Sequence, residues 1–238
     1  MNYQIHTIPV LDALNEKSNC PFCNMAQKLE KDGISFMMGP SYMEDDVRME
    51  TNKLGFCGPH LRAMYKEQNR LGLGLMLHTF MQQLNKDMEK LTPGNEDGVK
   101  IKKRGKFRAG LAEHLKKVDC SCYLCDKIDR TFKLYFETYI YLWKNDTEAA
   151  KLINDAFGYC IPHFIRLIEA AERALWAKDR EQFIKCAVMT QKRLMKDLEK
   201  DLEWFTLKFD YRNKDAPWHN AKDALPRAIS LLNGYKEE

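Results

Sequence analysis

Cys20-Pro21-Phe22-Cys23, followed by Gly55-Phe56-Cys57-Gly58-Pro59-His60-Leu61, decides the fold of the first half of this 238-residue chain. The second half repeats the pattern as Cys122-Tyr123-Leu124-Cys125 and Gly158-Tyr159-Cys160-Ile161-Pro162-His163-Phe164. Between the second cysteine of the CxxC and the cysteine of the later motif lie 33 residues in the first half and 34 in the second. Two copies with nearly one spacing indicate an internal duplication, which governs how every other motif is interpreted.

The duplicated cysteines and histidines have the spacing of zinc ligands. Zinc prefers four tetrahedral ligands drawn from thiolate and imidazole, and a two-residue spacer lets both ligands of one turn reach the same ion. Each half supplies two such turns and therefore four ligands. We predict two Zn²⁺, each bound within one half as a Cys3His site, with the ligands Cys20, Cys23, Cys57 and His60, and Cys122, Cys125, Cys160 and His163.

Other interpretations of these residues stay open at the level of sequence. A single buried cysteine is commonly a core residue, although the repeat and the ligand count argue against this for all eight positions. A thioredoxin-like role for Cys20 and Cys23 needs a surrounding βαβ pattern, which is absent from the sequence. Thiolate-rich sites also suit iron–sulfur clusters, so a redox or sensor protein is the main alternative.

The apolar spacing predicts an all-α protein, a multi-helix bundle made of two related halves, each with a CxxC/CxPH metal knuckle. Each CxxC is expected to open a helix, the first of which should stop at Asp32-Gly33. Pro59 and Pro162 should lie in the first turn of new helices. Beyond His60, one helix is expected to continue to about Lys90.

Composition shifts divide the chain into three regions. We expect a first helical Cys3His repeat over 1–95, a basic linker over 96–119, and a second repeat with a C-terminal helical extension over 120–238. The run from Lys100 to Arg108 could contact nucleic-acid phosphates. A solvated loop or helix start is the preferred interpretation, because no recognition motif accompanies this run.

Composition places the protein among ordinary globular proteins. Hydrophobic residues make up 45% and charged residues 30%, and the formal net charge of +4 predicts no partner. The most apolar stretch, Leu71 to Met81, is shorter than the roughly 20 residues of a membrane span. The N-terminus carries no secretory pattern, so we expect a cytoplasmic location, where eight cysteines indicate metal or redox work and not disulfides. The repeat leaves Cys120 and Cys186 without an assigned role.

The paired motifs CPFC and GFCxPH, with Phe209-Asp210-Tyr211-Arg212-Asn213 and the segment from Asp223 to Gly234, resemble a bacterial family known only as a domain of unknown function. The resemblance covers most of the chain, and its most specific part is the Cys/His pattern. It implies a bacterial, cytoplasmic protein and no particular reaction.

These observations favour a metal-binding helical scaffold or interaction module whose partner is another macromolecule, expected to be a protein. Four protein ligands leave no coordination position for water, which argues against hydrolytic zinc catalysis. The redox or sensor protein is the alternative, and a nucleic-acid binder is the weaker one.

Overall fold

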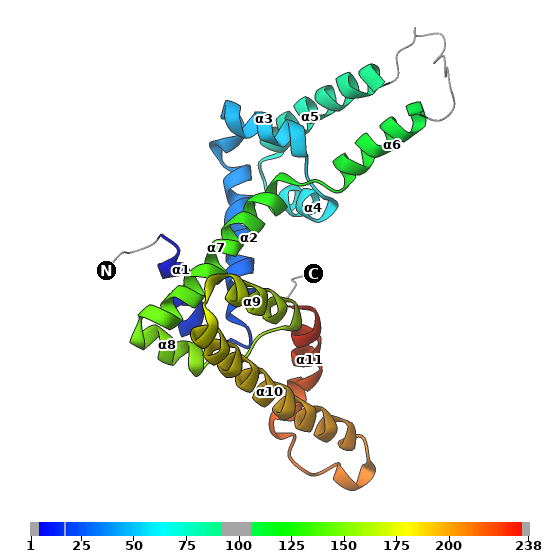
Figure 1. The fold of residues 1–238 in the computed structure, drawn as a ribbon. Helices are drawn as coiled ribbons and strands as arrows, with labels where there is room; N and C mark the ends of the chain where they lie inside the picture. The colour runs from blue at the N-terminus through cyan, green and yellow to red at the C-terminus, as the bar shows by residue number, and fades with distance from the viewer. Residues whose placement is uncertain (1–4, 17, 92–105, 235–238) are drawn as a thin grey trace. The chain divides into compact units, whose positions relative to one another are not determined.

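The computed structural model describes residues 5–16, 18–91 and 106–234, and over these ranges the protein is all-α, as predicted (Figure 1). The described residues form eleven α-helices and three short 3-10 helices, with no strand. None of the described helices combines the length and the apolar character that crossing a bilayer would need.

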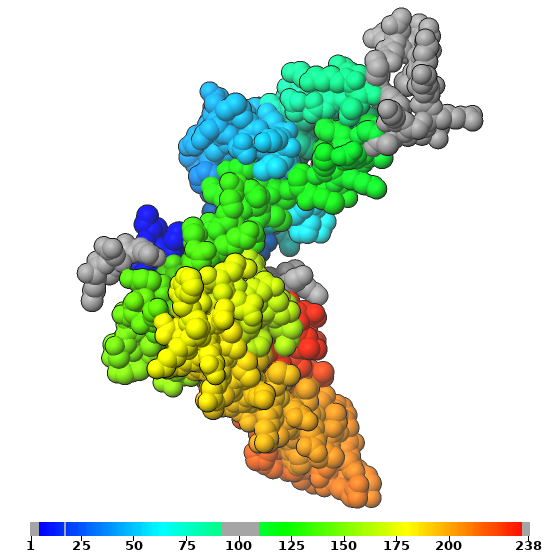
Figure 2. Space-filling model, viewed as in Figure 1, coloured from blue at the N-terminus to red at the C-terminus, as the bar shows by residue number. Residues whose placement is uncertain are grey.

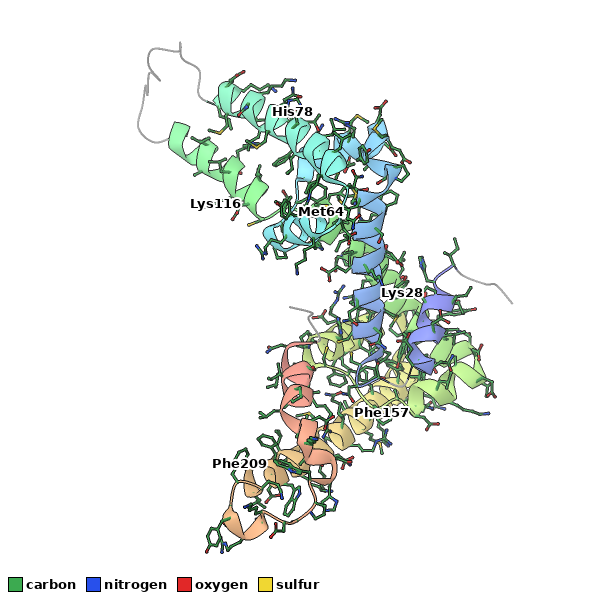
Figure 3. The ribbon with its side chains drawn as sticks, turned by 180° about the vertical axis from the view of Figure 1, so that it is seen from behind. Lys28, Met64, His78, Lys116, Phe157 and Phe209 are labelled. Atoms are coloured by element: carbon green, nitrogen blue, oxygen red, sulfur yellow. The ribbon has the colours of Figure 1, made fainter. Side chains whose placement is uncertain are left out.

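The chain divides into two compact units. Unit 1 comprises Met1–Gln27 and Thr131–Glu238, and unit 2 comprises Lys28–Arg130. Both boundaries fall inside helices, the first within α2 (Pro21–Met38) and the second within α7 (Tyr123–Asn145). Lys28, labelled in Figure 3, is the first residue of unit 2. The units differ from the regions 1–95 and 120–238 that composition suggests, because unit 1 takes residues from both ends of the sequence.

Unit 1 is built around aromatic side chains. Its other helices are α1 (Thr7–Asn15), α8 (Thr147–Asn154), α9 (Ile161–Ala174), α10 (Ala177–Leu207) and α11 (Ala224–Asn233). The ring of Phe22, from the first CxxC, stacks on Phe136 with 4.1 Å between ring centroids. The buried hydroxyls of Tyr139 and Tyr159 share a hydrogen bond of 2.9 Å, which satisfies both polar groups. Phe22 and Tyr159 of the motifs therefore belong to the core.

Unit 2 has a smaller core rich in methionine. Its helices are α3 (Asp45–Leu54), α4 (Gly58–Lys66), α5 (Arg70–Leu91) and α6 (Lys106–Asp119), with the 3-10 helix η1 (Pro40–Met43). The buried cluster consists of Met37, Met38, Val47, Met64, Leu73, Met76, Cys122, Tyr123 and Leu124. Met64, labelled in Figure 3, is fully buried. Methionine fills irregular space well but specifies a packing arrangement weakly.

Two helix ends differ from the sequence prediction. The helix after Cys23 does not stop at Asp32-Gly33 but continues to Met38. A Cβ on Gly33 would lie 3.1 Å from Leu124 Cδ2, so this glycine permits close helix packing and does not end the helix. The helix predicted from His60 to Lys90 is two helices, because α4 ends at Lys66 and α5 begins at Arg70.

The predicted linker over 96–119 is partly a helix. Residues 96–105 lie outside the described residues, while α6 occupies Lys106–Asp119 and packs beside α5. The basic run from Lys100 to Arg108 lies outside the residues whose side chains are described.

The segment after α10 is held by one lysine. Lys208 Nζ donates hydrogen bonds to the carbonyl oxygens of Asn213 at 2.6 Å, Lys214 at 2.9 Å and Ala216 at 2.6 Å. All three ammonium protons are thereby satisfied, although Lys208 is only 9% exposed. The side chain of Phe209 points to solvent from this segment, which Figure 2 shows in orange beyond α10.

Candidate metal centres

The eight predicted ligand residues meet in two groups of four. Site A comprises Cys20, Cys23, Cys160 and His163, and site B comprises Cys57, His60, Cys122 and Cys125. In each group the four candidate ligand atoms lie within 4.8 Å of one another. The prediction that each half builds its own site is wrong, because each CxxC meets the CxPH turn of the other half. Site A lies wholly in unit 1 and site B wholly in unit 2.

The distances in site A are those between neighbouring ligands of one ion. Cys160 Sγ lies 3.8 Å from Cys20 Sγ and 3.6 Å from Cys23 Sγ. His163 Nδ1 lies 3.2 Å from Cys160 Sγ and 3.5 Å from each of the other two sulfurs. All three cysteines are buried, with at most 7% exposure.

Site B has the same geometry at a more open position. His60 Nδ1 lies 3.1 Å from Cys57 Sγ, 3.3 Å from Cys122 Sγ and 3.4 Å from Cys125 Sγ. The sulfurs of Cys57 and Cys125 are 3.8 Å apart. Cys125 is exposed and Cys57 half-buried, whereas Cys122 and His60 are buried.

Both groups fit a single tetrahedral ion. Zn–S bonds of about 2.3 Å and Zn–N bonds of about 2.0–2.1 Å at tetrahedral angles imply S···S distances of about 3.8 Å and S···N distances of about 3.6 Å. The observed S···S values of 3.6–3.8 Å match, and the S···N values of 3.1–3.5 Å are slightly shorter. The donor set therefore suits one thiophilic ion per site.

All eight candidate ligand residues lie in the first turn of a helix or immediately before it. Cys20 immediately precedes α2 and Cys122 immediately precedes α7, while Cys160 and Cys57 are the N-cap residues of α9 and α4. Two helix N-termini thus point at each site. Their unpaired amide groups and positive dipole ends stabilise thiolate charge, and the Cys125 amide lies 3.5 Å from Cys122 Sγ. Proline in the first turn of α4 and α9 agrees with the sequence prediction.

A buried glutamine fixes the CxPH turn of site A. Gln191 on α10 accepts a hydrogen bond of 3.1 Å from the Tyr159 amide, and its own side-chain amide donates one of 2.9 Å to the Tyr159 carbonyl. Gly158, one residue earlier, packs so closely on α10 that an added Cβ would lie 2.3 Å from Leu194 Cδ2. Another residue at 158 would therefore require the Leu194 side chain to move.

Backbone hydrogen bonds join the two turns of site B. The Tyr123 amide donates to the Gly55 carbonyl at 3.0 Å, and Ser121 Oγ donates to the Leu54 carbonyl at 2.7 Å. These carbonyls end α3, where Gly55 has φ +59° and a Cβ would meet the Phe80 ring at 2.8 Å. Gly55 is the C-cap residue of α3, and glycine adopts such a positive φ without steric cost. Its carbonyl thereby anchors the start of α7 next to Cys57.

Proximity perturbs the cysteine pKa values. Burial raises the pKa of Cys20 well above its ordinary value, and burial with the neighbouring Cys122 charge raises the pKa of Cys125 to about 12. Burial also acts to raise the pKa of Cys122, but hydrogen bonds from His60 and backbone amides lower it to about 6. Three thiolates this close repel one another, and a bound cation offsets that repulsion.

The two histidines have different second neighbours, which sequence reasoning did not identify. His60 Nε2 lies 3.4 Å from Glu30 Oε1, whereas the His163 ring packs against Phe132 with 5.1 Å between centroids. Glu30 and Phe132 each lie seven residues after the second cysteine of a CxxC, so the two helices offer a carboxylate at site B and an aromatic ring at site A. A carboxylate on the far nitrogen orients a metal-bound histidine and strengthens it as a ligand.

We expect Glu30→Gln to weaken metal binding at site B by roughly 10–100-fold and to leave site A unchanged, since loss of such a partner has that effect in other metal sites. Competition with a chromophoric chelator measures both affinities. Asp32→Asn, which removes an exposed carboxylate from the same helix, is the control. An equal loss at both sites, or in both variants, would contradict the assigned role of Glu30.

The remaining cysteines stay outside both groups. Cys120 is exposed, and Cys186 on α10 donates to Asn154 Oδ1 at 3.0 Å. Cys186 therefore has a structural hydrogen bond, and nothing in the structure gives Cys120 a role.

Comparison with known proteins identifies the family and no relative of known role. No curated protein and no solved structure matches the chain. The sequence profile of a family of unknown function, DUF6062, matches residues 1–238, the whole of the sequence. The expected resemblance to an uncharacterised family is therefore confirmed, and the chain belongs to DUF6062.

Proposed function

We propose that this protein binds two Zn²⁺ ions as closed Cys3His sites and acts as a metal-braced helical scaffold for another macromolecule, expected to be a protein. One observation carries the proposal, namely that eight ligand atoms form two sets of four within 4.8 Å, at the separations of a tetrahedral ion. Each ion would tie two helix starts that are distant in sequence. Four protein ligands leave no position for water, so the ions support structure and not hydrolysis.

Zinc is favoured over an iron–sulfur cluster by the same distances. A cluster carries its protein ligands on separate iron atoms, which spreads them farther apart than the ligands of one ion. Here every candidate ligand atom in a site lies within 4.8 Å of the other three. A redox or sensor function would then depend on the thiols themselves or on a single iron ion.

A cytoplasmic location forms part of the proposal, because none of the eight cysteines, all of which lie among the described residues, forms a disulfide, and cysteines stay reduced in that compartment. Nucleic-acid binding through Lys100 to Arg108 gains no support, since that run falls outside the residues whose side chains are described.

The test is elemental analysis with a visible spectrum on protein purified without oxygen and without metal-chelating resin. We expect two zinc per chain, no visible absorption, and tetrahedral thiolate spectra after replacement by Co²⁺. Detection of iron with acid-labile sulfide would favour the redox or sensor alternative over the zinc scaffold. If the protein contains no metal, the cysteines would be core residues and not ligands.

A further inference from the structure

A cavity of about 190 Å³ lies against site A, within unit 1. Three of the four site A ligand residues, Cys20, Cys23 and Cys160, line it. The rest of its wall comes from the residues just before α2, from the start of α2, and from α10 and α11.

The walls of this cavity have an apolar side and a polar side. Leu194 and Leu198 from α10 and Leu231 from α11 form the apolar side. Exposed Asn19 and half-buried Gln27 lie on the polar side together with Ser18, whose buried Oγ has no hydrogen-bond partner among the described residues. Such a lining, mostly apolar with a few polar groups, is typical of sites for small molecules.

The charges around the cavity disfavour the binding of an anion. Arg227 is the one formally charged side chain of the lining, and its guanidinium lies 2.8 Å from Asp201 Oδ2 and 3.0 Å from Asp223 Oδ1. Its charge is thus already compensated by two carboxylates that are not part of the lining. If site A holds Zn²⁺ as proposed above, three thiolates and a neutral imidazole give the site a net charge of −1. The cavity therefore offers an anion no free positive partner.

We propose that unit 1 binds a small uncharged organic molecule in this cavity, with its apolar body against α10 and α11 and a hydrogen-bonding group toward Asn19 and Gln27. An apolar cavity of about 150 Å³ holds benzene, so the volume here suits a molecule of roughly six to ten non-hydrogen atoms. The ligand would pack directly on the residues that bind the metal, and its binding would stabilise site A and the position of α11.

The test compares benzamide with benzoate, which have the same size and differ in charge, on the full chain with its metal content measured in the same sample. Ligand-observed NMR gives the affinities. We expect benzamide to bind at least tenfold more tightly than benzoate. Equal binding of the two, or no binding of benzamide to protein with two metals, would overturn the proposal and leave the zinc sites standing. If the protein binds benzamide but its measured metal content is zero, the cavity proposal is supported and the zinc sites are rejected.

Variants with a larger side chain in the cavity test whether benzamide binds there. Ser230→Phe places a ring in the cavity from α11, while Ile229→Phe adds the same ring at the neighbouring position, which is 59% exposed. We expect the first variant to lose benzamide affinity at least tenfold with both metals retained, and the second to bind as the unaltered protein does. Gln27→Trp narrows the cavity from α2 and replaces Ser230→Phe if the latter fails to fold. Unchanged binding in the filled variant would overturn the assignment.

Discussion

A chain carrying both Cys23→Ser and Cys160→Ser is expected to keep one metal ion, whereas Cys23→Ser combined with Cys57→Ser is expected to lose both. The first pair removes two ligands of site A and leaves site B intact, while the second pair removes one ligand from each site. A tetrahedral structural site that lacks a thiolate binds its ion far more weakly. Metal content after dialysis against a mild chelator distinguishes the outcomes.

The controls for this experiment are the three single variants, each of which should retain one ion. The opposite result, with one ion in the Cys23/Cys57 variant and none in the Cys23/Cys160 variant, would restore the within-half pairing that the sequence suggests. Two ions in both double variants would exclude these cysteines as ligands.

Chelation of the metal is expected to unfold unit 2 and to loosen unit 1 only around its ligand turns. The buried cluster of unit 2 includes four methionines and only three other aliphatic side chains, Val47, Leu73 and Leu124. Structural zinc sites contribute about 10–16 kcal/mol of apparent binding free energy, which is coupled to folding. Unit 1 keeps a core of stacked aromatic rings that does not depend on an ion.

Hydrogen exchange measures this difference. Amides of α3, α4 and α5 should lose protection when EDTA is added, while those of α10 should keep most of theirs. Cys57→Ser is the matched control, since it should reproduce the loss in unit 2 without chelator and with site A loaded. Equal loss of protection in both units would contradict the prediction that the core of unit 1 stays folded without metal.

The sequence predicted the helical class and all eight grouped residues, because both follow from local patterns. Helix starts at Pro59 and Pro162 follow equally from local chemistry. Which CxxC pairs with which CxPH turn does not follow from local patterns. All four turns have the same two-residue spacer between their ligand residues, so either CxxC could complete a site with either CxPH turn.

The incorrect pairing and the incorrect helix stop at Gly33 have one physical cause. Continuation of α2 to Met38 makes this helix 18 residues long, or about 27 Å at 1.5 Å per residue. All residues from Met38 to Cys57 belong to unit 2, whereas Cys23 belongs to unit 1. Whether a glycine ends a helix or permits a close contact depends on the partner, here Leu124, and that partner is 91 positions away.

Glu30 was missed for a related reason. It lies on the helix that begins at site A but contacts His60 of site B, so its role is visible only once the turns are paired correctly. Its position seven residues after Cys23 was the available signal, although the same offset after Cys125 gives Phe132.

The crossed arrangement also sets an order of events during synthesis. The last ligand of site B to be translated is Cys125, and the last ligand of site A, His163, follows it by 38 residues. At 5–20 residues per second the ribosome needs about 2–8 s to cover that stretch. Cys20 and Cys23 are the first ligand thiols to be made, yet their site is the second to be completed. The slower the ribosome, the longer these two thiols stay open to oxidants and to competing metals.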